Sequence, residues 1–141
     1  MRLEKSYRLI PSEMSIEYAA LESGLDRFVR LDKEADFIGK EALGAWQERG
    51  FENRFVTLEV HGVVDADARG SEAIYSNGEM VGRATSGGYG FRLGKSLALG
   101  MVRPDLAVPG TELEIEILAE RRSATVLEES PYDPENVALR S

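Results

Sequence analysis

The stretch Glu79–Met101, EMVGRATSGGYGFRLGKSLALGM, predicts two strands joined by a glycine-rich connection. Residues 80–84 form the first β-like run, and residues 96–102 alternate large apolar side chains with small ones. Such a period of two is typical of a half-buried strand. The segment 85–90 between them contains three glycines, which tolerate positive φ angles and close backbone approach. We therefore expect a tight connection within a β domain at this point.

The same period of two recurs on both sides of this stretch. Strands are expected over residues 54–60, 72–75, 111–118 and 123–127. The dipeptide Asn77-Gly78 after the second of them favours a type I′ hairpin turn. These short strands predict a small antiparallel β-barrel or sandwich from residue 51 onward. The side chains expected to be buried in it are Leu97, Leu99, Leu113, Ile115 and Ile117.

The first fifty residues show a different, mixed pattern. Residues 36–49 carry apolar side chains at helical intervals and end before a glycine, which predicts a helix. Residues 15–24 favour a short helix or helical turn, and strands are expected over residues 2–10 and 25–31. The predicted fold class is therefore α+β. A small α+β piece at residues 1–50 precedes an antiparallel barrel at residues 51–141.

Composition sets limits on function. The chain has 141 residues with a formal net charge of −8, of which 43% are hydrophobic and 30% charged. This is typical of a soluble globular protein, and no apolar run approaches the roughly 20 residues that a membrane helix needs. The negative charge argues against general nucleic-acid binding, which needs a basic face. The absence of cysteine excludes disulfides and suits a reducing compartment, so we expect a cytoplasmic protein.

The residues form no evident catalytic constellation or metal site. His61, the single histidine, follows an expected strand and has no Gly-x-Ser-x-Gly partner. Glu112, Glu114 and Glu116 share one face of a strand, which is typical of a solvated surface rather than of a glycosidase pair. We therefore predict no catalytic residue and no metal ligand in this chain.

Several motifs together resemble a known family. The string V-G-x-x-T-S-G-x-x-x-x-x-L-G-K-S-L-A-L, at residues 81–99, resembles the C-terminal barrel signature of the aminomethyltransferase family. That family includes the glycine-cleavage T-protein and the folate-binding halves of dimethylglycine and sarcosine dehydrogenases. The segments 21–25 and 36–43 also resemble family segments, and Tyr132–Asn136 is similar to the dimethylglycine and sarcosine dehydrogenase branch. Residues 1–50 then correspond to the end of a folate-binding α+β domain.

The resemblance implies a function and a set of binding residues. In the intact family, a one-carbon unit passes from a small amine substrate to tetrahydrofolate. The resemblance assigns Glu4 of Arg2-Leu3-Glu4 to the folate pterin, where a carboxylate accepts two N–H bonds. It also brings Arg54 near the folate, while Tyr7 packs either on the ligand or in the core.

The chain also departs from the family pattern. Ile10-Pro11 stands where family members have an aromatic residue and a glycine, so we expect weakened folate binding. The family's catalytic aspartate lies upstream of Arg2-Leu3-Glu4, so we expect this chain to be a C-terminal fragment that is inactive alone. FAD would belong only to an upstream domain. The alternatives are a non-catalytic β-barrel that serves as an interaction or scaffold module, and an enzyme of unrelated chemistry.

Overall fold

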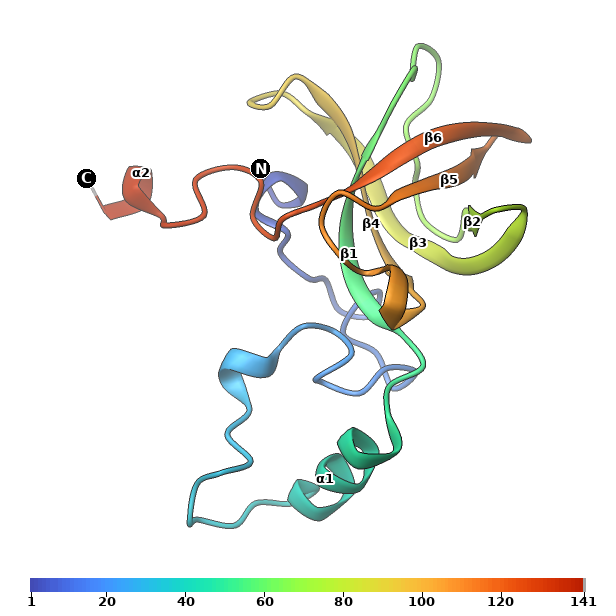
Figure 1. The fold of residues 1–141 in the computed structure, drawn as a ribbon. Coiled ribbons are helices and arrows are strands. Elements are labelled where there is room, and N and C mark those ends of the chain that lie inside the picture. Colours follow the sequence, from blue (N-terminus) through green and yellow to red (C-terminus); the bar gives the residue numbers. More distant parts are fainter. Residues whose placement is uncertain (141) are drawn as a thin grey trace.

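The computed structural model describes residues 1–140, except the side chain of residue 139. Within this part of the chain, six antiparallel strands close into a barrel in the order β1-β4-β3-β2-β5-β6 (Figure 1). The strands are β1 Arg54–Val60, β2 Ala73–Ser76, β3 Glu79–Gly90, β4 Lys95–Val102, β5 Glu112–Ile117 and β6 Glu120–Leu127. The predicted antiparallel barrel is confirmed.

Short helices flank the barrel. The α-helices are α1 Lys40–Arg49 and α2 Val137–Arg140, and the 3-10 helices are η1 Leu3–Lys5, η2 Asp26–Phe28 and η3 Pro104–Leu106. The predicted helix over residues 36–49 is confirmed, although α1 begins four residues later, after Gly39 with φ of 89°. No helix in the described residues is long and apolar enough to cross a membrane.

The two strands expected near the N-terminus are wrong. Residues 2–10 form η1 and turns, and residues 25–31 contain η2. A closed barrel leaves no unpaired edge on which another strand could form its ladder. The N-terminal segment therefore contacts the barrel through side chains and isolated backbone hydrogen bonds.

The glycine-rich segment 85–90 continues β3 rather than forming the expected connection, and the chain reverses between Gly90 and Lys95. A Cβ atom at Gly87 would overlap the Ala68 carbonyl oxygen, and one at Gly82 would overlap the Met101 carbonyl oxygen. These glycines therefore serve close backbone approach. The turn predicted at Asn77-Gly78 is confirmed, because both residues have positive φ, 51° and 82°.

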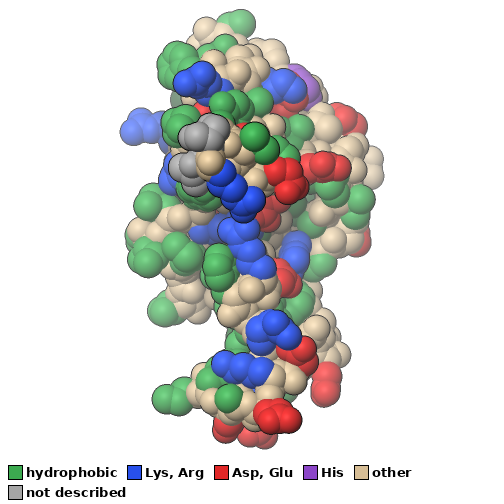
Figure 2. Space-filling model, turned by 90° about the vertical axis from the view of Figure 1, so that its left-hand side faces the viewer, with side chains coloured by type: hydrophobic (Ala, Val, Ile, Leu, Met, Phe, Trp, Pro, Cys, Tyr) green, Lys and Arg blue, Asp and Glu red, His purple; other side chains and the backbone are tan. Residues whose placement is uncertain are grey.

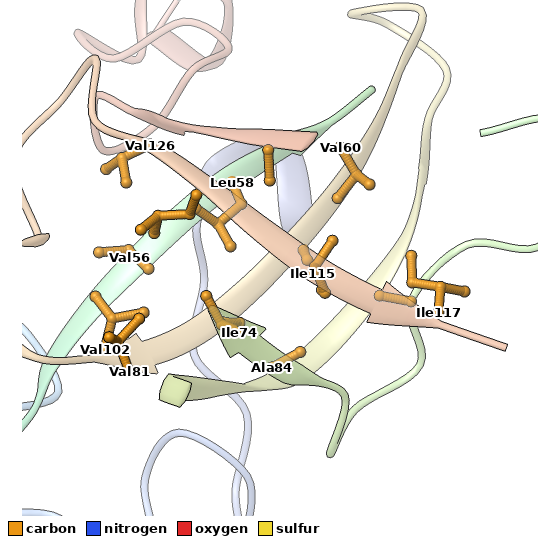
Figure 3. Close-up of a cluster of buried hydrophobic side chains, with 14 residues drawn as sticks. Val56, Leu58, Val60, Ile74, Val81, Ala84, Val102, Ile115, Ile117 and Val126 are labelled. Atoms are coloured by element: carbon orange, nitrogen blue, oxygen red, sulfur yellow. The ribbon is translucent and has the colours of Figure 1, made fainter. Parts of the chain in front are cut away.

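The barrel encloses a core of aliphatic side chains, among them Leu58, Ile74 and Ile115, each 0% exposed (Figure 3). All five side chains predicted to be buried are so, and none is more than 3% exposed. Phe55, Leu99 and Met101 form a second cluster, against which Leu3 and Tyr18 pack. Residues near the N-terminus therefore cover β1 and β4 from outside the barrel.

Candidate functional site

A cavity of about 490 Å³ lies where the two ends of the described chain meet. Its volume falls within the range of roughly 300–1,000 Å³ that is usual for small-molecule sites. It is lined by Met1, Arg2, Lys5, Tyr7, Arg92, Tyr132, Asp133, Asn136 and Ala138. These residues come from the η1 region, from the β3–β4 turn and from the segment after β6, which passes beside the N-terminus in Figure 1.

The cavity wall after β6 is tied to η1 by hydrogen bonds. Lys5 Nζ donates to the carbonyl oxygens of Tyr132 at 3.2 Å and Asp133 at 2.6 Å. The Tyr132 N–H donates to the Glu4 carbonyl oxygen at 3.0 Å. Ser130 Oγ donates to the Lys5 carbonyl oxygen at 3.0 Å. These contacts join segments more than a hundred residues apart and fix the position of Tyr132 at the cavity.

Glu4 holds the β3–β4 turn against η1. Its side chain is 1% exposed, and Oε1 accepts the backbone N–H of Arg92 at 2.6 Å and of Leu93 at 3.3 Å. Oε2 pairs with the Met1 ammonium at 3.0 Å. Burial by itself raises the pKa of Glu4, but the hydrogen bonds from Met1, Arg92 and Leu93 outweigh it and leave the pKa below its ordinary value. Glu4 thereby places Arg92 at the cavity.

Tyr7 lies at the cavity rather than in a core. Its side chain is 47% exposed and lines the cavity, and its carbonyl oxygen accepts a hydrogen bond from Arg2 Nη1 at 2.9 Å. An aromatic ring in this position offers a face on which a planar ligand can stack. The structure therefore brings Tyr7 and the Arg92 turn held by Glu4 to one site.

Arg54 lies elsewhere. It donates to both carboxylate oxygens of Asp26, at 3.2 and 3.1 Å, and to the Leu21 carbonyl oxygen at 2.6 Å. It lines a separate cavity of about 170 Å³ together with Phe55 and Glu129. In the described structure Arg54 therefore connects the N-terminal segment to the start of β1. Its contact with folate stays a prediction.

The structure also draws attention to two cavity side chains to which the sequence assigns no role. The Arg92 guanidinium forms no hydrogen bond or ion pair within the described residues. The Asn136 Oδ1 atom is buried and has no hydrogen-bond partner there. The sequence signals are weak, because Arg92 occupies an unspecified position of the residue 81–99 string. Among the described residues, no group of three or more His, Asp or Glu side chains is placed to hold a metal ion.

Comparison with known proteins gives these features a context. A family model described as the glycine cleavage T-protein C-terminal barrel domain matches residues 53–133. The chain belongs to this family. It is 42% identical over 129 residues to mitochondrial dimethylglycine dehydrogenase of Mus musculus, and 37% identical over 135 residues to an aminomethyltransferase of Synechocystis sp.. The predicted resemblance to aminomethyltransferases and dimethylglycine dehydrogenase is confirmed, and the chain is an aminomethyltransferase-like C-terminal domain.

The matches cover this chain almost completely but cover only part of its relatives. The alignment with the mouse protein covers 92% of this chain but only 15% of the mouse protein. The alignment with the Synechocystis protein covers 96% of this chain and 36% of that protein. The crystal structure of glycine cleavage system aminomethyltransferase T from Bartonella henselae superposes with a TM-score of 0.84 over 94% of this chain and 37% of that chain. At 23% identity, this likeness supports the fold.

Proposed function

We propose that this chain is the C-terminal part of a tetrahydrofolate-dependent aminomethyltransferase-like module of a dimethylglycine or sarcosine dehydrogenase-type protein. In the intact protein, a one-carbon unit passes from a small amine substrate to tetrahydrofolate. The observation that carries this proposal is the cavity that Tyr7 lines, beside the turn held by Glu4, in a chain 42% identical to a dimethylglycine dehydrogenase. The division into residues 1–50 and 51–141 is part of the proposal, supported by the family match over residues 53–133.

The cavity suits part of a folate molecule. Tyr7 offers a ring for stacking, and the buried, unpartnered Asn136 Oδ1 accepts a hydrogen bond from a ligand. We propose that the buried Glu4 carboxylate, which accepts the backbone N–H groups of Arg92 and Leu93, also accepts N–H groups of the pterin in the intact protein. Tetrahydrofolate supplies the nitrogen that accepts the one-carbon unit. The residues of this chain bind and orient it, and positioning of reactants is a major source of catalysis.

Other parts of the proposal rest on the family and the composition. We propose that the chain alone does not catalyse one-carbon transfer, and that any FAD binds to a region outside it. A cytoplasmic location and the absence of nucleic-acid binding stay predictions from the composition and the net charge of −8.

Calorimetric titration with 5-formyltetrahydrofolate, a stable reduced folate, tests the proposal. We expect weak but saturable binding to the 141-residue chain. Tyr7→Leu is expected to weaken it about fivefold, because a lost ring contact costs about 1 kcal/mol. Tyr89→Leu is a matched control, since Tyr89 is 48% exposed but lines a different cavity. Absence of saturable heat, or equal weakening by both substitutions, would contradict a folate site at Tyr7.

A second candidate function is that of a non-catalytic interaction module. It is favoured by two aliphatic side chains, Ile16 and Ile38, which are 105% and 104% exposed. A partner that covered these side chains would gain about 1.5–3 kcal/mol for each isoleucine that it buried. The same titration separates the two candidates, because an interaction module produces no folate heat.

A further inference from the structure

We propose that Arg92 and Asn136 form a binding subsite for an N-acyl amino acid, in which a carboxylate lies close to an amide N–H. One source of this chemistry is the glutamyl end of folate, and that part of the inference rests on the proposed function. A free N-acyl amino acid is the other source. The subsite itself follows from the contacts of the cavity residues.

Arg92 lines the cavity, and its guanidinium can bind an anionic ligand. In this acidic chain, other arginines, such as Arg30, Arg54 and Arg103, pair with a carboxylate. The Arg92 guanidinium has no such partner among the described residues. Figure 2 faces the side of the molecule on which the chain ends lie, and it shows Lys and Arg side chains gathered in a band across this face. A guanidinium with free N–H groups binds a carboxylate in a bidentate manner.

The other charged groups at the cavity already have partners. Lys5 Nζ donates to two carbonyl oxygens, and Arg2 Nη1 donates to the Tyr7 carbonyl oxygen. The Asp133 carboxylate accepts the backbone N–H of Val137 at 2.7 Å, so it is engaged with its own segment. Among these cavity cations of the described chain, Arg92 is the one whose side chain has no partner, so all of its N–H groups can serve an anionic ligand.

Hydrogen bonds to Glu4 fix the backbone position of Arg92 in the β3–β4 turn. Its N–H donates to the buried Glu4 carboxylate at 2.6 Å, and the Leu93 N–H donates to the same oxygen. The turn therefore does not have to be ordered when a ligand binds, so the guanidinium reaches the cavity from a preformed backbone.

Asn136 adds a neutral acceptor. Its Oδ1 atom is buried without a hydrogen-bond donor, and its backbone N–H donates to the Asp133 carbonyl oxygen at 2.9 Å. A buried acceptor without a donor is costly, and a ligand N–H removes that cost. An amide N–H for Asn136 and a carboxylate for Arg92 are adjacent groups in any N-acyl amino acid. This pairing defines the ligand class.

The test is a ¹⁵N NMR titration of the 141-residue chain with three small probes. The probes are 4-aminobenzoyl-L-glutamate, which is the folate tail without the pterin, hippurate, which is another N-acyl amino acid, and 4-aminobenzamide, which lacks the carboxylate. We expect the first two to shift the Arg92 Nε–Hε and Asn136 side-chain amide signals saturably, and the third to bind at least tenfold more weakly. Tighter binding of 4-aminobenzoyl-L-glutamate than of hippurate would identify the folate tail as the source. Equal binding of these two would identify a general N-acyl amino acid site.

Variants make the assignment specific. Arg92→Gln is expected to weaken both carboxylate probes about tenfold and to bring their affinity close to that of 4-aminobenzamide. Asn136→Leu should weaken all three probes, because each offers an amide N–H. Arg69→Gln is the matched control, since Arg69 is exposed, carries the same charge and lies outside the cavity. The spectra of the free variants report directly whether the fold is retained.

Several outcomes would overturn the subsite. They are the absence of shifts at millimolar probe, equal affinity for 4-aminobenzamide, and unchanged affinity in Arg92→Gln. Failure of the proposed function looks different. If 4-aminobenzoyl-L-glutamate binds through Arg92 but the reduced folate gains no affinity over it, the subsite stands and the pterin assignment fails. If the reduced folate binds through Tyr7 and is indifferent to Arg92→Gln, the folate site stands and the subsite fails.

Discussion

Residues 1–24 and residues 25–50 both precede the barrel, yet they relate to it in opposite ways. The first segment buries Glu4, Glu13 and Glu22, each no more than 1% exposed. In the second segment, none of the ten described residues of α1 is buried. Figure 1 shows the same contrast, because the first segment runs along the barrel and α1 lies away from it. Phe28, at 69% exposed, belongs to the second segment as well.

Buried carboxyl groups, together with the apolar side chains of Leu3 and Tyr18, attach the N-terminal segment to the barrel. Glu13 accepts hydrogen bonds from the hydroxyls of Thr85 at 2.6 Å and Ser86 at 2.7 Å in β3. Glu22 accepts the N–H groups of Glu52 and Asn53, just before β1. Residues 25–50 offer no equivalent buried carboxyl group among their described residues. The polar contacts that distinguish residues 1–24 from residues 25–50 therefore join groups far apart in the sequence.

The largest expected effect is that of Glu22→Ala. It leaves three backbone N–H donors, those of Ala19, Glu52 and Asn53, without their acceptor. We expect the free energy of unfolding to fall by about 3 kcal/mol, because one buried and two part-buried hydrogen bonds to a carboxylate are lost. Urea denaturation measures this. Glu41→Ala, on exposed α1, is the matched control and should change it by less than about 0.5 kcal/mol. Equal losses in the two variants would remove the distinction between the segments.

A smaller loss is expected for Ser86→Ala. The substitution removes the hydroxyl that donates to buried Glu13 but leaves the Thr85 hydroxyl in place. We expect the free energy of unfolding to fall by about 1.5 kcal/mol, which is usual for a hydrogen bond to an acidic group. Ser15→Ala removes an exposed hydroxyl that only accepts the Glu17 N–H, and it serves as the control. A Ser86→Ala protein as stable as Ser15→Ala would show that Glu13 does not attach the segment.

Acid should weaken the contact between η1 and the β3–β4 turn. The pKa of Glu4 is lower in the folded chain than its ordinary value of 4.5. Glu4 therefore stabilises the fold above that value, and the contribution is lost as the pH falls from 4.5 through the lower native pKa. We expect the stability difference between the natural chain and Glu4→Gln to narrow over that interval. The free energy of unfolding, measured in urea at several pH values, checks this. A difference that stays constant with pH would contradict the ionised role of Glu4.

The smallest effect is expected for Ile38→Ser in the exposed segment. Ile38 is 104% exposed, so the substitution removes no contact on which the fold depends. The free energy of unfolding should change by no more than about 0.5 kcal/mol. Thermal and urea denaturation both measure it. A loss above about 1 kcal/mol would show that residues 25–50 are packed in solution, contrary to the contrast with residues 1–24.

The strand β5 could be predicted because one of its faces is apolar. Leu113, Ile115 and Ile117 alternate with glutamates, and this alternation identifies both the strand and its buried face. The role of Gly87 is harder to predict than that of an apolar strand residue, since glycine occurs both in turns and where two backbones lie close together. Its use depends on Ala68, a partner that no local pattern reveals. The strand expected at residues 2–10 failed because closure of the barrel, a property of the whole sheet, removes the edge that it needs.

The candidate site was predictable only in part. Glu4 and Tyr7 were found through a resemblance to a family, and their folate contacts stay predictions. Arg92 and Asn136 are cavity candidates because their side chains lack hydrogen-bond partners in the described structure. A sequence pattern does not show whether a side chain will find a partner in the fold. The glutamates at positions 13 and 22 look like ordinary charged residues in the sequence. Their burial depends on donors more than twenty residues away.

Closure of the barrel has a consequence for synthesis of the chain. The first strand, β1, pairs with the last strand, β6, with Thr57 opposite Leu127 and Val60 opposite Ala124. One edge of β1 can therefore be paired only after β6 has been made. As the chain leaves the ribosome, that edge of β1 stays unpaired until about 70 further residues have been made. Pairing between such distant segments is slow, and an open edge can capture a strand of another chain. A barrel that exposes no edge once complete is therefore most prone to aggregate while it is being made.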